Sequence, residues 1–249
     1  MLTAAQTYLQ ALVDQHPVPD LPVGRAQAVM GDLGVRVNMQ ELMSHNRVLV
    51  LLDELKGALP PSAQQLLHDG RLAVGEIGID VPNAHVIKLD GGQFVVVLHS
   101  GLFAFLYRIA RPLASTVFRS TADAGAGIDR PELARVIAEV FWWLQKTGDS
   151  FGPQYEVTLG QKFIANLLAT GAERFLLAHE LGHVLFAMGV QTEVEGAEWP
   201  GDSIEEHVAD MAGLYLSLSP YKDVRGETDQ LRLMLAYAGA ELALQIWGV

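Results

Sequence analysis

Two histidines and a glutamate interrupt an apolar run in the stretch FLLAHELGHVLF, residues 175–186. His179 and His183 are four residues apart, so on a helix they lie on one face, where two imidazoles can hold one metal ion. Glu180 points about 100° away around the helix, so it reaches a water on the metal instead of the metal itself. This arrangement is the HExxH pattern, in which the glutamate takes the proton of that water.

The alternative interpretation is a pair of hydrogen-bonded core histidines on a packed helix. For this composition, a bare HExxH pattern is expected by chance on the order of 0.015 times per chain. Burying two histidines and a glutamate in an apolar run is costly unless something pairs with them, and one metal ion can pair with the group. Gly182 leaves room beside the motif for another backbone or for a substrate. We therefore expect one Zn²⁺ per chain.

A catalytic zinc site needs a third protein ligand and leaves its fourth position to water. The extended pattern with a third histidine fails, because Phe186 and Gly189 occupy the positions that it assigns to glycine and histidine. The later segment SIEEHVAD places Glu206 and Asp210 four residues apart, on one helix face. We expect Glu206 to bind zinc and Asp210 to accept a hydrogen bond from a ligating imidazole, which fixes its tautomer.

Other assignments for this segment stay open. Ser203 and Glu206 have the spacing of a capping box, which would occupy Glu206 at the helix start. Asp202 and Glu205 have the same spacing, so Glu205 can take the capping role and leave Glu206 free. His207 is a rival ligand, about 100° around the helix from Glu206. We favour Glu206 over both neighbours.

The periodicity of apolar residues predicts the elements that position these side chains. The first 70 or so residues look helical, with breaks at HPVPDLPVG and LPPS. A hairpin is expected over residues 85–98, with Asp90, Gly91 and Gly92 in its turn. Helices are expected over residues 100–112, 129–148, 172–188, 203–219 and 229–247. Trp142 and Trp143 are interpreted as core or subunit contacts in preference to a cage for a ligand. Mostly helical elements beside a small sheet predict an α+β fold.

Composition limits the classes of function. The chain has 249 residues, half of them hydrophobic and 18% charged, so we expect a packed core. The absence of cysteine excludes disulfides and thiolate metal sites, and a reducing compartment fits. A net charge of −12 disfavours nucleic acid and anionic membranes as partners. The N-terminus has no signal-peptide pattern and residues 94–110 are too polar to span a membrane, so we expect a cytoplasmic protein without a membrane span.

The two motifs together resemble the gluzincins, zinc metallopeptidases with HExxH on one helix and a glutamate ligand on a later one. HELGH followed by EEHVAD is similar to the HtpX-like and CAAX-prenyl endopeptidase family, whose second helix carries E-x-x-A-D. VPNAHVIKLDGGQFVVVLHSGLFAFL is similar to that family's Pro-Asn-Ala, strand and Gly-Leu run, which there forms an edge strand over the active site. The short distance between the two zinc helices is closer to soluble ImmA-like peptidases, and ERFLLAHELGH also has a parallel there.

The resemblance covers roughly residues 80–110 and 172–216. It implies a zincin-like domain over residues 76–249, with the hairpin beside the HExxH helix. A helical N-terminal segment over residues 1–75 precedes that domain or is continuous with it. The implied activity is a soluble zinc-dependent endopeptidase that acts on a peptide or protein substrate, with Glu180 as general base.

Three further points concern substrate and activity. Residues 93–98 are expected to bind an extended peptide by strand addition. The donor to the oxyanion stays open between Tyr155, His207 and Tyr215. Two alternatives to a peptidase are a zincin-fold protein that binds or regulates a partner without cleaving it and a zinc amidase with a non-peptide substrate. The intact Glu180 argues against the non-catalytic alternative.

Overall fold

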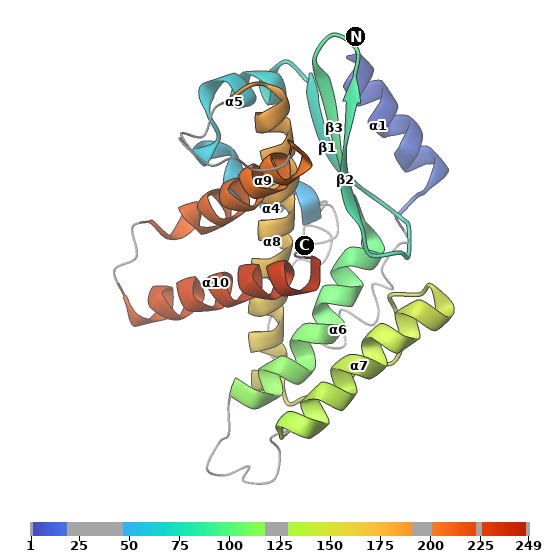
Figure 1. Ribbon diagram of the computed structural model, residues 1–249, viewed down its shortest axis with the longest axis vertical. Coiled ribbons are helices and arrows are strands. Elements are labelled where there is room, and N and C mark those ends of the chain that lie inside the picture. Colours follow the sequence, from blue (N-terminus) through green and yellow to red (C-terminus); the bar gives the residue numbers. More distant parts are fainter. Residues whose placement is uncertain (1, 19–46, 118–128, 191–200, 223–225, 248–249) are drawn as a thin grey trace, which may run out of the picture.

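Helices dominate the protein and surround one small sheet within the residues that the structure describes (Figure 1). The computed structural model describes residues 2–18, 47–117, 129–190, 201–222 and 226–247. The elements are α1 (Ala4–Gln15), α4 (Arg47–Leu55), η1 (Lys56–Ala58), α5 (Pro61–His68), β1 (Leu72–Ile77), β2 (Ala84–Leu89), β3 (Gln93–His99), α6 (Ser100–Val117), α7 (Arg130–Thr147), α8 (Leu159–Ala187), α9 (Gly201–Leu218), η2 (Ser219–Tyr221) and α10 (Glu227–Trp247). The predicted α+β class is confirmed.

The sheet has the strand order β1-β3-β2. Strands β2 and β3 are antiparallel and joined by the turn at residues 90–92, which confirms the hairpin predicted over residues 85–98. Strand β1 was not predicted, and it pairs in parallel with β3. Because β3 has a neighbour on each side, residues 93–98 have no free edge, and the prediction that they bind a peptide by strand addition is wrong. The edge strand of the hairpin is β2.

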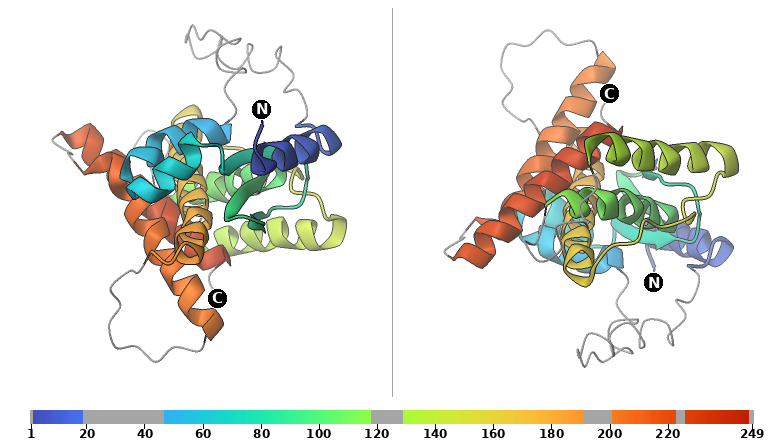
Figure 2. Two further views of the ribbon diagram at one scale, coloured as in Figure 1. Left: turned by 90° about the horizontal axis from the view of Figure 1, so that it is seen from above. Right: turned by 90° about the horizontal axis from the view of Figure 1, so that it is seen from below.

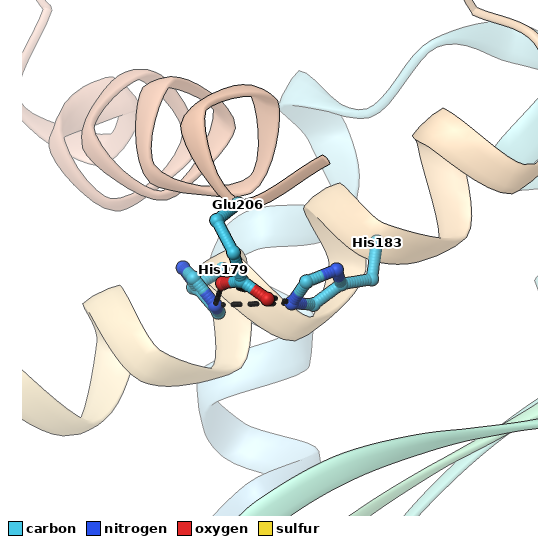
Figure 3. Close-up of side chains that lie close together, drawn as sticks. All are labelled: His179, His183 and Glu206. Atoms are coloured by element: carbon cyan, nitrogen blue, oxygen red, sulfur yellow. Dashed lines mark hydrogen bonds and ion pairs between the residues drawn. The ribbon is translucent and has the colours of Figure 1, made fainter. Parts of the chain in front are cut away.

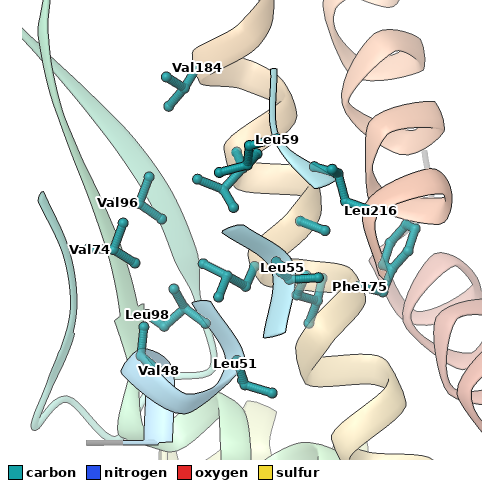
Figure 4. Close-up of a cluster of buried hydrophobic side chains, with 14 of the residues drawn as sticks. Val48, Leu51, Leu55, Leu59, Val74, Val96, Leu98, Phe175, Val184 and Leu216 are labelled. Atoms are coloured by element: carbon teal, nitrogen blue, oxygen red, sulfur yellow. The ribbon is translucent and has the colours of Figure 1, made fainter. Parts of the chain in front are cut away.

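Both faces of the sheet are covered, and side-chain alternation assigns each residue to one of them. Ala73, Ile77, Val95 and Val97 pack with Ala5 of α1 on one face. Val74, Val96 and Leu98 pack on the other face with residues of α4 and α8 (Figure 4). This two-sided burial explains the unbroken apolar run FVVVL of the central strand.

Helix α8 is the long central helix against which α6, α9 and α10 pack (Figures 1 and 2). It begins at Leu159, well before the predicted residue 172, and Thr158 and Gln161 form a capping box at its start. It ends at Ala187, and Gly189 follows with a φ of 71°. The helix therefore carries His179, Glu180 and His183 near its C-terminal end, where Glu180 is buried and the two histidines are half-buried.

Two sequence interpretations are corrected by the packing. Helix α6 continues through Pro112 to Val117, beyond the predicted end. Ala110 and Ala114 on either side of the proline pack in one cluster with residues of α8, and this contact keeps the segment helical. Trp142 is 59% exposed, so of the two roles expected for it the core role is excluded and a subunit contact stays open.

The N-terminal segment shares its core with the remainder of the chain. Val48, Leu51 and Leu55 of α4 belong to the same cluster as Leu177 and Leu181 of α8. Arg47 also pairs with the buried Glu173, and Arg174 pairs with Glu54. Strand β1 spans the expected domain boundary at residue 75. None of the helices in the described ranges is long and apolar enough to cross a membrane.

Candidate metal centre

The close crossing of α8 and α9 brings the two sequence motifs together. A Cβ on Gly182 would lie 2.6 Å from the Cα of Ala209 and 3.0 Å from its carbonyl oxygen. Only glycine permits this approach, since Cβ contacts below 3.0 Å force atoms to shift. Gly182 thus admits the backbone of α9, and Glu205, Glu206 and Asp210 all lie within four residues of the crossing point.

Three potential ligand atoms converge at this crossing (Figure 3). The Nε2 atoms of His179 and His183 are 3.1 Å apart. An Oε2 atom of Glu206 lies 3.5 Å from the first of them and 3.8 Å from the second. Within the described ranges, this group of His179, His183 and Glu206 has ligand atoms within 4.8 Å of one another, and it does not include His207.

A carboxylate lies behind each histidine. Asp210 Oδ1 is 2.9 Å from Nδ1 of His179, and Glu205 Oε1 is 3.0 Å from Nδ1 of His183. An ionised carboxylate only accepts hydrogen bonds, so each Nδ1 is the nitrogen that carries the proton. In the neutral imidazoles, both Nε2 atoms then present lone pairs to each other and to Glu206. Burial lowers the pKa of His179, with the neighbouring His183 as a second cause, and this favours the neutral form.

The arrangement fits a tetrahedral metal ion. A zinc ion with Zn–N distances of about 2.0–2.1 Å holds two ligand nitrogens about 3.3 Å apart. The three separations here are 3.1, 3.5 and 3.8 Å. Two imidazole nitrogens and one carboxylate oxygen are a donor set that zinc accepts, with the fourth position left for water. Lone pairs that face one another at this distance repel unless a cation lies between them.

Glu205 is the residue whose role was misassigned from the sequence. The spacing from Asp202 suggested a helix cap, whereas the structure directs the Glu205 carboxylate to His183. The spacing of the acidic residues on α9 could have identified this role of Glu205. Glu205 and Asp210 lie five residues apart on α9, so they flank Glu206 and can reach the two different histidines. The sequence interpretation considered such support for only one of them.

Glu180 is the residue that the sequence pattern predicts as the general base. It is 8% exposed and lines the same cavity as the three ligand residues. Burial raises its pKa to about 8, and the nearby charge of Glu206 adds to the effect. A dication at the three ligand atoms would offset the Glu206 charge and lower this pKa again. A carboxyl group that titrates near neutral pH can both accept and donate a proton.

The cavity beside these residues has a volume of about 870 Å³. One wall is the edge strand β2 with Ala84, Val86 and Lys88, and the other walls come from α8, α9 and α10. Of the three candidate oxyanion donors, His207 lines this cavity. Tyr155 lines a different cavity, and Tyr215 is 72% exposed on α9. Geometry therefore leaves His207 as the donor candidate nearest to the ligand residues.

Comparison with known proteins adds no relative. No protein-family model matches the chain, and neither a curated protein nor a solved structure matches it significantly. The resemblance to gluzincins consequently remains a prediction that rests on the motifs and on the geometry of the site.

Proposed function

We propose that this protein is a zinc-dependent endopeptidase with a zincin-like fold. The observation that carries the proposal is the convergence of two imidazole Nε2 atoms and one carboxylate, with a second carboxylate behind each imidazole. In this proposal His179, His183 and Glu206 bind the zinc ion, and Asp210 and Glu205 orient the two imidazoles.

Zinc in this position would supply a water of lowered pKa and would polarise the scissile carbonyl. Glu180 accepts the proton of the attacking water and then delivers it to the nitrogen of the leaving amine. Its burial supports the first step, because a raised pKa makes the carboxylate a stronger base. His207, on the cavity wall, is the candidate hydrogen-bond donor to the developing oxyanion.

The edge strand β2 supports a peptide as the substrate. It pairs with β3 on one side, and its residues Ala84, His85, Val86 and Lys88 line the cavity that contains Glu180. An extended peptide can add to such an edge through main-chain hydrogen bonds. The strand-addition surface that was expected on residues 93–98 is therefore reassigned to β2.

A peptide-library digestion tests the proposed function. Zinc-loaded protein is incubated with a mixture of unstructured peptides, and cleavage products are identified by mass spectrometry. The matched control is Glu180→Gln, which preserves shape but cannot take a proton. We expect new internal termini with the wild type and none with the variant. Zinc-loaded protein that leaves the whole library intact would favour the non-catalytic alternative, and equal cleavage by both proteins would point to a contaminant.

A further inference from the structure

A second cavity, of about 500 Å³, lies between α7 and the extended segment at residues 153–155. It shares no lining residue with the cavity at the metal centre. Its lining combines a guanidinium from α6 with three large aromatic side chains, namely Arg108, Trp142, Trp143 and Tyr155. The proposed peptidase chemistry uses none of them.

Arg108 is a buried cation without a close anionic partner in the described part of the chain. It is 2% exposed, and it donates to the carbonyl oxygens of Ser150 and Pro153 at 3.0 and 3.2 Å. It forms no ion pair with any described carboxylate, and burial lowers its pKa, with Asp149 only partly offsetting that effect. Burying a charge in this way is costly unless an anion compensates it.

An unpaired donor lies at the same cavity as Arg108. In the described ranges, five buried side-chain polar atoms lack a hydrogen-bond partner. One of them, Trp143 Nε1, belongs to a residue that lines this cavity. An indole nitrogen is a donor only, and its unpaired N–H dipole adds to the positive potential of the guanidinium. The site therefore complements a negative charge.

The walls complement a flat apolar group. Trp142 is 59% exposed, although tryptophan is usually covered in a folded protein, and it lines the cavity together with Tyr155. At the rim, Glu139 is already paired with Arg135, so its charge is partly neutralised. A volume of this size suits a small organic molecule.

We propose that this cavity, between α7 and residues 153–155, binds a small aromatic carboxylate. The carboxylate pairs with Arg108, and the ring lies against Trp142 and Trp143. Charge-assisted contacts to a guanidinium provide affinity and orientation, and the indole faces provide apolar contact area. The proposal is independent of peptidase activity.

Isothermal titration with 2-naphthoate tests the proposal, with the uncharged 2-naphthamide as the matched ligand. Because a carboxylate can also bind a metal ion, the titration is repeated with EDTA and with Glu206→Ala. We expect one naphthoate per chain, unchanged by either treatment, and at least about tenfold weaker binding of the amide. Equal binding of the two ligands, loss of binding with EDTA, or no measurable binding at about 1 mM, a weak-affinity limit, would overturn the proposal.

Two variants locate the site. Arg108→Gln should weaken naphthoate at least tenfold and leave the weak amide binding nearly unchanged, with folding checked by circular dichroism. Trp142→Ala, which removes an exposed wall without a hydrogen bond, should weaken both ligands severalfold. Phe163→Ala is the control, since Phe163 is a similarly exposed aromatic residue outside the cavity. If Arg108→Gln does not fold, the location is tested by the Trp142→Ala variant, and the need for a charge is tested by comparing naphthoate with naphthamide. Equal naphthoate affinity of Trp142→Ala and Phe163→Ala would refute the assigned location.

Discussion

Removing the carboxylate behind either histidine should weaken zinc binding without abolishing it. Asp210→Ala and Glu205→Ala each leave three ligand residues in place but free one imidazole to rotate. Loss of such a partner typically reduces metal affinity about 10- to 100-fold. The Asp210 and Glu205 side chains are 38% and 45% exposed, so water can replace part of each contact. We therefore expect the lower end of that range. Each variant should bind zinc about tenfold more weakly than the wild type, which corresponds to about 1.4 kcal/mol of binding free energy.

The double variant provides a stricter expectation. Asp210 and Glu205 contact different imidazoles, at 2.9 and 3.0 Å, and no direct contact between the two carboxylates is present. Their effects should then multiply to about 100-fold, with only modest coupling. Glu205→Gln keeps an acceptor oxygen and should recover part of the loss that Glu205→Ala causes.

The assay is a competitive titration with a chromophoric zinc chelator, and circular dichroism confirms that each variant is folded. Glu206→Ala loses a direct ligand and should release most of the zinc, whereas His207→Ala should retain wild-type affinity. Wild-type zinc affinity in both Asp210→Ala and Glu205→Ala would refute the reasoning about orientation. Loss of zinc in His207→Ala together with retention in Glu206→Ala would mean that the site has three histidines and that Glu206 was wrongly assigned.

Three other outcomes follow from the geometry. Glu180→Gln should keep wild-type zinc affinity and lose peptide hydrolysis, as measured by equilibrium titration and product formation; hydrolysis near the wild-type rate would show that Glu180 is not the base. Because the ionised form of Glu180 is the base, kcat/KM of the zinc-loaded protein should rise with pH through the Glu180 pKa, which bound zinc holds below its raised metal-free value, and a flat profile would contradict the assignment. Gly182→Ala should separate α9 from α8 and weaken zinc binding. The control is Gly160→Ala, because a Cβ at that position meets nothing within 4 Å. Equal zinc affinity of the two variants would contradict the conclusion that the close crossing of α8 and α9 requires Gly182.

The predictable parts of the site were those set by local spacing. The separation of His179 and His183 by one helical turn follows from sequence alone, and so does the shared face of Glu206 and Asp210. The hairpin was also predictable, because its turn residues and apolar arms are contiguous in sequence. The helix predicted over residues 129–148 is confirmed as α7, which has Asp129 as its N-cap and Gly148 directly after its last residue.

The parts that escaped prediction depend on contacts between distant segments. Strand β1 has Gly75 in its middle, where Leu9 of α1 packs closely, so its pattern is interrupted and its pairing with β3 has no local signal. The position of β3 at the centre of the sheet follows from that pairing, and the misplaced peptide-binding edge was a consequence. Glu205 was misassigned for the same reason, because its contact with His183 exists only once α8 and α9 cross.

The most direct test of the account is the metal content of the purified protein after zinc loading and removal of excess metal. Elemental analysis by plasma mass spectrometry should find one zinc per wild-type chain. The His179→Ala, His183→Ala and Glu206→Ala variants should each retain far less, while His207→Ala should retain one. Well under one zinc per wild-type chain, or a full equivalent in all three ligand variants, would contradict the proposed metal centre and the peptidase function that depends on it.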